Sequence, residues 1–451
     1  MKRFKNWWDR LLFRDRGIVP TKKLLILYSA FTAILFLLSF WRFSWVFLLI
    51  STAIVIAVST ADLFLSPHKN EWSVKRTSPR ETERYQGEQL SITVTNHSAF
   101  SMHVRFVDDL PRSFQPSYPN NIFIPKQRAA TIEYQVWPQV RGKYSINYLY
   151  IRYTSMIGLW EKQVTISQPD TIKVIPNLSE TKRYLASAQT YLLHEGLKIR
   201  KMKSGTGEFS KVRNYVVGDD PRKINWRQSA KFQEIMTNEF EPEHGKHITI
   251  CIDCGRMMGV ELEEGNRLEK SVEAAITLAA AALDNGDYVA VVVFSKEIQA
   301  VAPAGKGLQH LDTILQTIYA VQVDAQESNY PLAIQYAQTL QQKRSMIVLF
   351  SDVATFVHED HHLFYMKQLR KRHLFLMLGI EDRLLQKTIS QTPETTAIAM
   401  RKSIAQKQYL YQKQVMTKWE KHGLPMLEAP ADQLAVTAVS HYIQTLNRGL
   451  L

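Results

Sequence analysis

Two uncharged apolar blocks near the N-terminus restrict the possible folds of this chain more than any other feature. Leu24–Phe40 and Ser44–Ala61 contain no Asp, Glu, Lys or Arg, and an aromatic and basic join at 41–43 separates them. Each block approaches the ~20 residues that a helix needs to cross a hydrocarbon core of ~30 Å. We therefore predict a transmembrane helical hairpin over residues 24–66. A cleaved signal peptide fits less well, because the first block is long and no small-residue cleavage site follows it.

The charges that flank the blocks predict their orientation. Residues 1–23 form a basic arm with eight Lys and Arg and two Asp, and basic flanks of membrane spans stay in the cytoplasm. The expected arrangement is a two-pass protein of the plasma (inner) membrane with both termini in the cytoplasm. Trp7 and Trp8 favour contact of the arm with anionic membrane lipid. Despite the formal net charge of +14, the sequence contains no nucleic-acid-binding motif, so we expect no nucleic-acid partner.

Residues 72–176 consist of short alternating runs separated by turn residues. The stretches 89–96, 131–140 and 144–153 alternate apolar and polar side chains. Regular short strands with turns favour a β-sandwich of roughly 100 residues. No catalytic pattern stands out in it, so we expect a spacer or a binding platform near the membrane.

Residues 178–246 are expected to hold a helix and then a dense signature block. The block contains Gly205, Glu208, Phe209, Arg213, Tyr215, Gly218, Asp219, Asp220, Pro221, Arg222 and Trp226. Paired carboxylates at 219 and 220 can do acid–base chemistry, but Asp-Asp-Pro also makes a turn in which Asp caps backbone N–H groups. In the structural interpretation, Arg213 and Arg222 bridge the turn to the following domain and Trp226 anchors it.

Residues 247–451 show the alternation of strands and helices of a doubly wound α/β domain. Strands are predicted at 247–253, 288–294, 345–351, 373–379 and 424–429. Their near-continuous apolar character is typical of strands buried on both faces. In such folds, functional sites form at the carboxyl ends of the strands.

The only two cysteines form a C-x-x-C motif, Cys251 and Cys254, at the end of the first of these strands. A redox pair normally has its first Cys at a helix N-terminus, which a strand does not provide. Zinc is an alternative through His244 and His247, but His247 and Cys251 would lie ~13 Å apart along a strand. We favour buried cysteines that pack the strand, with Asp253 as the polar residue delivered to the rim of the sheet.

A second metal pattern occurs at His358, Glu359 and His362, which fit H-E-x-x-H. This five-residue pattern binds zinc in metallopeptidases. No further ligand follows at a metzincin spacing, although a more distant Glu remains open. We favour a polar helix start near the same rim.

The segment GEFSKVRNYVVGDDPRKINWRQSAK, followed by ITICIDCGRMM, resembles the domain of unknown function 58 family. The α/β domain of that family is similar to von Willebrand factor A. The segment RYTSMIGLW at 152–160 also resembles the aromatic-glycine turn near the end of the family's β-domain. The resemblance extends over nearly the whole chain and implies a protein partner, a MoxR-type AAA+ ATPase, in assembly or maturation of other proteins.

The resemblance also implies a position for a metal-ion-dependent adhesion site, D-x-S-x-S with a Thr and a distant Asp. Asp253 matches the first Asp, whereas Gly255 and Met257 replace both serines. Ser328 stands where the Thr would be, and Asp352 matches the last Asp. Two carboxylates and a hydroxyl leave room for weak Mg²⁺ binding. The alternative is a degenerate site whose aspartates cap helix starts or pair with Arg256.

Taken as a whole, the sequence favours a non-enzymatic, membrane-anchored cytoplasmic adaptor or scaffold that binds a protein partner. It contains no Walker A motif, so the partner would supply the energy of ATP hydrolysis. One alternative is a metal-dependent hydrolase that uses Asp219, Asp220 and the rim formed by Asp253 and Asp352. Another is a purely structural membrane scaffold.

Overall fold

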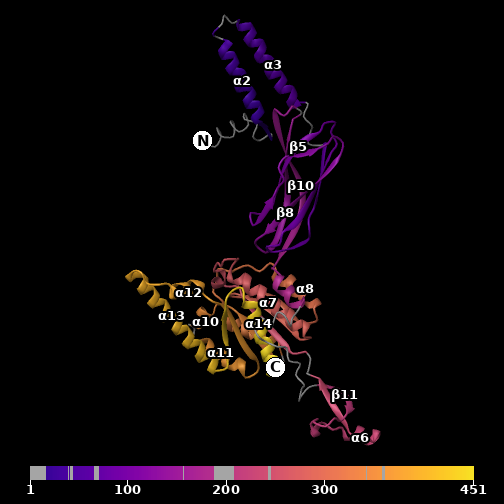
Figure 1. The fold of residues 1–451 in the computed structure, drawn as a ribbon, viewed down its shortest axis with the longest axis vertical. Coiled ribbons are helices and arrows are strands. Elements are labelled where there is room, and N and C mark those ends of the chain that lie inside the picture. The colour runs from indigo at the N-terminus through magenta and orange to yellow at the C-terminus, as the bar shows by residue number, and fades with distance from the viewer. Residues whose placement is uncertain are drawn as a thin grey trace. The chain divides into compact units, whose positions relative to one another are not determined.

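The computed structural model describes residues 17–38, 40, 44–64, 71–155, 157–186, 208–241, 245–341, 343–357 and 361–451. The chain divides into two compact units, with the division between Ile175 and Pro176 (Figure 1). The first unit contains two apolar helices and a β-sandwich, and the second contains an α/β domain and a separate two-stranded arm.

The first unit begins with helices α2 (Lys22–Leu38) and α3 (Trp45–Phe64). Most of their large apolar side chains are exposed. Among the described residues, α3 alone is long and apolar enough to cross a membrane, whereas α2 has 17 residues. The prediction of two membrane spans is therefore supported only as one candidate span.

The sandwich consists of a six-stranded and a four-stranded sheet. The first has the order β1-β10-β9-β5-β7, with β3 also paired to β10, and the second has the order β2-β4-β8-β6. The strands are β1 (Ile18–Pro20), β2 (Trp72–Thr77), β3 (Glu81–Glu83), β4 (Glu88–Asn96), β5 (Met102–Asp108), β6 (Phe114–Ser117), β7 (Ile122–Ile124), β8 (Ala129–Pro138), β9 (Gly142–Thr154) and β10 (Trp160–Ile175). Side chains alternate between buried and exposed along β2, β5 and β8. The inner faces of both sheets share one hydrophobic core, which is the packing that the alternation predicts.

The link from β9 to the start of β10, described at residue 155 and at residues 157–160, joins the sandwich to helix α3, and we name it the junction turn. Asp62, 1% exposed near the end of α3, accepts hydrogen bonds from the backbone N–H groups of Ile157 at 2.8 Å and Leu159 at 3.1 Å. The hydroxyl of Ser155 donates to the same carboxylate. Because a buried carboxylate requires such donors, Asp62 fixes the turn to the helix.

The junction turn also holds the start of α2 and a second point on α3. The indole N–H of Trp160 donates to the carbonyl oxygen of Ser59 at 2.9 Å. The hydroxyl of Thr21 donates to the carbonyl oxygen of Gly158 at 2.8 Å, and strand β1 just before it pairs with the start of β10. Both helices are thus attached to the same end of the six-stranded sheet.

The second unit contains a six-stranded sheet with the order β15-β14-β13-β16-β17-β18. Its strands are β13 (His247–Asp253), β14 (Tyr288–Phe294), β15 (Ile298–Lys306), β16 (Ser345–Phe350), β17 (Leu374–Ile380) and β18 (Met426–Ala429). All neighbours are parallel except β14 and β15. The antiparallel edge strand β15 is an element that the sequence analysis does not predict.

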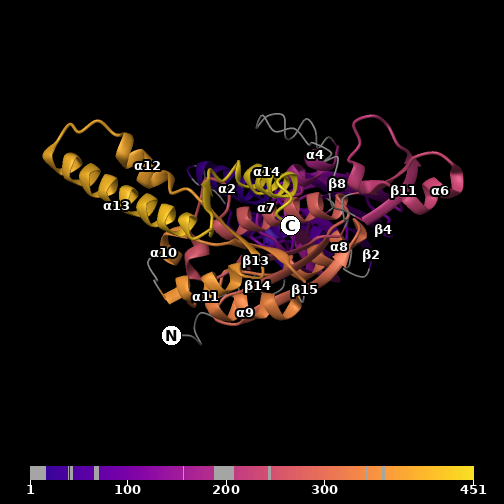
Figure 2. The same cartoon turned by 90° about the horizontal axis from the view of Figure 1, so that it is seen from below.

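Helices cover both faces of this sheet (Figure 2). The helices of this domain are α4 (Ser179–Ala186), α7 (Arg267–Asp284), α8 (Gln309–Ile318), α9 (Tyr330–Leu340), α10 (Val353–Val357), α11 (His361–Arg370), α12 (Arg383–Ser390), α13 (Thr396–Lys421) and α14 (Leu434–Asn447). One core packs the sheet against α7, α8 and α14, and the other packs it against α9, α10, α11 and the end of α13. Helices on both faces explain why the parallel strands are apolar throughout.

The signature block forms an arm of its own. Strands β11 (Glu208–Asn214) and β12 (Met236–Glu241) pair with each other in an antiparallel two-stranded sheet. Between them lie the short 3₁₀-helix η3 (Pro221–Lys223) and helix α6 (Trp226–Phe232). We name residues 208–241 the signature arm. Gly205 lies outside the described residues, as do Trp7 and Trp8 of the basic N-terminal segment.

Candidate functional site

Asp253 lies at the carboxyl end of β13, next to the residues that follow β16. Since β13 and β16 are parallel neighbours, Ser351 and Asp352 reach the same rim of the sheet as Asp253. Ser328 and Tyr330, from the start of α9, complete the group through contacts with Asp253. The structure therefore brings together Asp253, Ser328 and Asp352, the three residues that the resemblance places at a metal site.

Asp253 is 1% exposed, and both oxygen atoms of its carboxyl group accept hydrogen bonds from within the domain. It accepts from the backbone N–H of Gly255 at 2.8 Å, from the Tyr330 hydroxyl at 3.2 Å and from the hydroxyls of Ser328 and Ser351. Burial raises the pKa of the Asp253 carboxyl above its ordinary value, and the bonds from Ser328 and Ser351 oppose part of this rise. Internal donors thus occupy the oxygen atoms that a metal ion would need.

The glycine at 255 has a steric cause. A Cβ atom built on Gly255 would lie 2.1 Å from the Ser328 hydroxyl oxygen and 3.1 Å from the carbonyl oxygen of Gln326. Any side chain there, including the first serine of the adhesion-site pattern, would collide with Ser328. Met257, which replaces the second serine, is about one-third exposed and brings no oxygen ligand. Ser328 can therefore occupy its position only because residue 255 has no side chain.

Asp352 is neutralised by an arginine. Its Oδ1 lies 2.5 Å from Nη1 of Arg267, the first residue of α7, and both side chains are largely buried. Its Oδ2 accepts from the backbone N–H and the hydroxyl of Thr355, at 3.0 and 2.6 Å, at the start of α10. The expected helix-capping role of this aspartate is present. The expected pairing with Arg256 is wrong, because Arg256 lies at the surface and pairs with Glu327 at 3.4 Å.

The residues of this rim do not fit a Mg²⁺ ion. A cation at the site would compete with the guanidinium of Arg267 for Asp352 and with four hydrogen-bond donors for Asp253. No cluster of three or more His, Cys, Asp or Glu that could hold a metal occurs among the residues that the structure describes. The geometry supports no metal-dependent step at this rim.

The two cysteines are buried on opposite faces of the sheet. Cys251 belongs to the core beneath α9, and Cys254 belongs to the core beneath α7. Burial raises the pKa of the Cys251 thiol to about 12, so the thiolate does not form near neutral pH. His247 stacks on Tyr288, and His244 lies outside the described residues. His358 and Glu359 of the H-E-x-x-H pattern also lie outside them.

The turn of the signature arm is held by its own aspartates. Arg213 donates two hydrogen bonds of 2.7 Å to the carboxylate of Asp219, one to each oxygen, and this arginine lowers the pKa of Asp219. Tyr215 donates from its hydroxyl to the Asp219 carbonyl oxygen at 3.2 Å. Asp220 accepts from the backbone N–H of Arg222 and caps η3, and Gly218 has φ +110. These contacts agree with the interpretation of Asp219 and Asp220 as turn-forming residues rather than as acid–base groups.

Two details of that interpretation are wrong. Arg213 makes its described ion pairs within the arm, with Asp219 and Glu239, and does not bridge to the following domain. Trp226 is 71% exposed and so is not a buried anchor of the turn, and Asn225 caps the start of α6. The backbones of Glu208 and Phe209 pair with Glu241 and Phe240 in the two-stranded sheet.

The tip of the signature arm is apolar and basic. Val216, Val217, Phe232 and Ile235 are exposed in addition to Trp226, and Val217 reaches 97% exposure. Arg222, Lys223, Arg227 and Lys231 lie in the same short segment. Exposed apolar clusters of this kind mark interaction surfaces, and Trp beside basic residues is common where partners bind.

A second exposed arm was missed by the sequence analysis. Helices α12 and α13 extend away from the sheet (Figure 2), and Met400, Ile404 and Tyr411 of α13 are exposed at helical spacing. Residues 383–421 contain eight Lys and Arg and two Glu. Exposed apolar residues at spacings of four and seven along a basic stretch could have identified this helix.

The comparisons with known proteins agree with the family resemblance of the signature block. Residues 211–390 match the family described as "Protein of unknown function DUF58". The "Uncharacterized protein YeaD" of Bacillus subtilis (strain 168) is 23% identical over 258 residues, which cover 54% of this chain and 61% of that protein. The chain thus spans less than two thirds of the length of this relative. Together these matches support a protein of the DUF58 family.

Several solved structures also resemble parts of this chain. The crystal structure of the conserved hypothetical protein BatB from Bacteroides thetaiotaomicron has a TM-score of 0.31 and 16% identity and covers 45% of this chain and 100% of that chain. The PapD-like domain 7 of human CEP192 has a TM-score of 0.18 and 9% identity and covers 23% of this chain and 85% of that chain.

Proposed function

We propose that this chain is a membrane-anchored adaptor that binds a protein partner through the tip of the signature arm. The observation that carries the proposal is the exposure of Val217 and Trp226 beside four basic side chains. Tryptophan is among the residues that contribute most to binding when a partner covers it. The basic residues favour a partner with an acidic surface.

The contacts at the rim support an adaptor over a metal-dependent hydrolase. Asp253 and Asp352 are occupied by hydrogen bonds and by Arg267, and Asp219 is occupied by Arg213. A hydrolase needs a carboxylate that is free to hold a metal or to accept a proton. The rim carboxylates instead stabilise the α/β domain, whose fold we take to be of the von Willebrand factor A type.

The partner that we propose is a MoxR-type AAA+ ATPase, which the family resemblance implies. The chain contains no Walker A motif, so the ATPase would supply the energy for assembling or maturing other proteins. We propose further that α2 crosses the membrane together with α3, which leaves both termini in the cytoplasm beside the partner. A reporter fused at Leu451 should then be active in the cytoplasm, and activity on the opposite side would refute this topology.

The test of the adaptor function is co-purification of the full-length protein from native membranes in mild detergent, followed by mass spectrometry. Wild type is compared with Val217→Ser/Trp226→Ser, because these exposed side chains can be replaced at little cost to folding. Met400→Ser/Ile404→Ser on α13 is the matched control, since it also removes two exposed apolar side chains.

The expected result is an AAA+ ATPase recovered with wild type and with the α13 control but lost from the signature-arm variant. Loss from the α13 control alone would move the binding surface to α13. If the purified ATPase fails to bind wild type in vitro, the adaptor proposal is refuted and a structural scaffold remains.

A further inference from the structure

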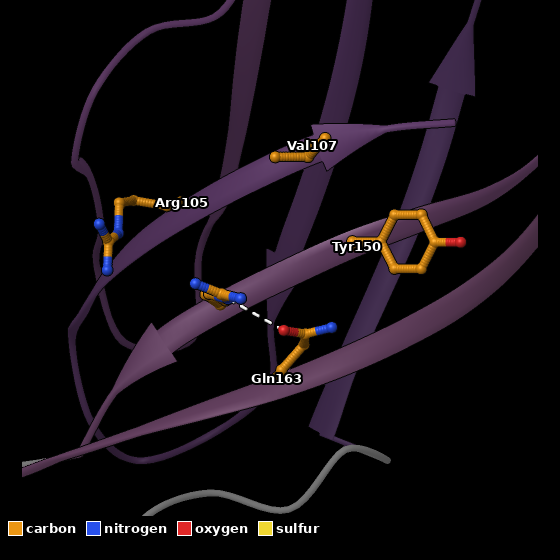
Figure 3. A pocket seen from close by; sticks show the side chains of 5 residues that line it. Arg105, Val107, Tyr150 and Gln163 are labelled. Atoms are coloured by element: carbon orange, nitrogen blue, oxygen red, sulfur yellow. Dashed lines mark hydrogen bonds between the residues drawn. The ribbon is translucent and has the colours of Figure 1, made fainter. Parts of the chain in front are cut away.

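The outer face of the six-stranded sheet in the first unit carries an open pocket of about 370 Å³. Its lining comes from three neighbouring strands, with Arg105 and Val107 on β5, Tyr150 and Arg152 on β9 and Gln163 on β10 (Figure 3). The sequence alone does not group these five residues, because they come close together only after the strands pair.

The strand register places two arginines next to each other. Arg105 lies directly opposite Arg152, and Arg152 lies directly opposite Gln163 on its other side. In the next row, Val107 lies opposite Tyr150. Like charges in directly opposed positions destabilise a sheet, so this arrangement has a cost that a bound anion would offset.

The charges of the pocket are only partly balanced. Glu161 forms an ion pair with Arg105, whereas Nε of Arg152 donates to the side-chain oxygen of Gln163 at 2.9 Å. Among the described residues, no carboxylate pairs with Arg152. The guanidinium of Arg152 therefore keeps donors for a ligand, and guanidinium groups match the oxygen geometry of phosphate.

The junction turn places this pocket close to the end of α3. Arg152 precedes Ser155 by three residues on β9, and Gln163 follows Trp160 by three residues on β10. At a strand rise of ~3.3 Å per residue, the Cα atoms of these two residues lie at most about 10 Å from the turn. Since Asp62 and Ser59 of α3 bond to that turn, a membrane-spanning α3 brings the pocket to the level of the lipid headgroups.

We propose that this pocket binds the phosphate of an anionic phospholipid headgroup, with Arg105 and Arg152 as the phosphate ligands. Val107 and the Tyr150 ring provide an apolar surface beside the charge, which suits the glycerol and upper acyl carbons of a lipid and gives nothing to free phosphate. The assignment rests on the membrane anchoring in the proposed function. The negative surface potential of a cytoplasmic leaflet would concentrate such lipids at this depth.

The experiment is a titration of the full-length protein in mild detergent with short-chain phosphatidylglycerol, followed by native mass spectrometry. Phosphatidylcholine and inorganic phosphate are the comparison ligands. Arg105→Gln/Arg152→Gln removes both proposed phosphate ligands. Arg112→Gln/Lys143→Gln is the control, because it removes two exposed positive charges of the same sandwich, and Lys143 is nine residues from Arg152, about 30 Å along β9.

Wild type and the control should bind phosphatidylglycerol alike and in preference to phosphatidylcholine. The Arg105/Arg152 variant should bind about 25-fold more weakly, from about fivefold for each arginine at an anionic surface. Glu161→Gln should bind more tightly than wild type, because it removes the carboxylate that competes for Arg105. Equal affinity of the pocket variant and the control would overturn the proposal.

Two further outcomes separate this inference from the proposed function. Inorganic phosphate that competes as strongly as phosphatidylglycerol would show a free-phosphate site and overturn the lipid assignment. Fractionation of the same cells tests the anchoring itself: a protein recovered in the soluble fraction refutes the proposed function, whereas a membrane-bound protein with unchanged lipid affinity in the pocket variant refutes only the lipid site.

Discussion

Replacement of Gly255 by serine tests whether the hydrogen bonds of the rim depend on the close packing of Ser328 against Gly255. The substitution restores the first serine of the adhesion-site pattern, but its Cβ would lie 2.1 Å from the Ser328 hydroxyl oxygen. Ordinary van der Waals contact begins at about 3.4 Å, so Ser328 must move by more than 1 Å. Moving it breaks its hydrogen bond to the buried carboxyl of Asp253.

Two costs add up in the Gly255→Ser variant. Overpacking of a tight site costs about 1–3 kcal/mol, and the broken hydrogen bond to a buried carboxyl adds about 1–3 kcal/mol. We expect the α/β domain to lose about 3 kcal/mol. For a domain of about 200 residues this lowers the melting temperature by roughly 6–12 °C.

The assay is thermal unfolding of the full-length protein in mild detergent, with hydrogen exchange of β13 and β16 peptides to assign the transition to the α/β domain. Ser328→Ala, which removes the hydroxyl without adding volume, should cost less than Gly255→Ser. The double variant Gly255→Ser/Ser328→Ala should be more stable than Gly255→Ser alone, because the clash is gone and the introduced serine hydroxyl can donate to Asp253.

The coupling between the two positions should reach at least about 1 kcal/mol, which is typical for side chains in contact. Additive effects in the double variant would refute the steric explanation of the rim. The same would follow if Gly255→Ser had the melting temperature of wild type.

Three other predictions concern the rim and the junction turn. Mg²⁺ should raise the melting temperature of wild type little, because a ligand stabilises a protein only if it binds the folded state and the rim oxygens are already hydrogen-bonded. A large, saturable rise that disappears in Asp253→Ala would show that the rim binds the ion. The pKa of Asp253 is raised by burial, so its contribution to stability is complete below the unfolded pKa of about 3.9 and declines as pH rises through the folded pKa. The stability of wild type relative to Asp253→Asn should therefore fall from about pH 4 upward, and parallel pH profiles of the melting temperature would argue against this. Asp62→Ala leaves two backbone N–H groups of the junction turn without their acceptor, which should cost about 2–3 kcal/mol and speed hydrogen exchange of residues 157–160; unchanged exchange would show that Asp62 does not hold the turn.

The sequence predicts the buried parallel strands well because their apolar runs are short and uninterrupted. The predicted strands at 247–253 and 288–294 coincide with β13 and β14. Strand β15, with the sequence IQAVAPAGK, has small residues and a proline and lies at the edge, so its pattern resembles a loop. Helix α13 was missed for a different reason: Met400, Ile404 and Tyr411 face solvent, and its large buried residues, Met416 and Trp419, lie near the end of the helix. The helix therefore has no continuous buried stripe of the kind by which a helix is usually recognised.

The candidate site was predictable only for residues at strand ends. Asp253 and Asp352 follow apolar strands, and parallel strands bring their ends together. Arg267 could not be foreseen, because its pairing with Asp352 joins segments 85 residues apart. The same holds for the contacts of Tyr330 and Ser351 with Asp253. The exposure of Trp226 contradicts the usual expectation that a tryptophan is at least partly buried.

The pairing of β1 with β10 has a consequence for the order in which this chain folds during synthesis. Ile18 pairs with Lys162, so the ribosome must add about 140 residues after β1 before its partner strand exists, which takes roughly 7–30 s at 5–20 residues per second. Both apolar helices emerge well within that interval, so under the proposed topology they enter the bilayer before the contacts of Thr21 and Asp62 with the junction turn can form. Under that topology the junction turn does not guide membrane insertion, and it fixes the two helices only after they have inserted.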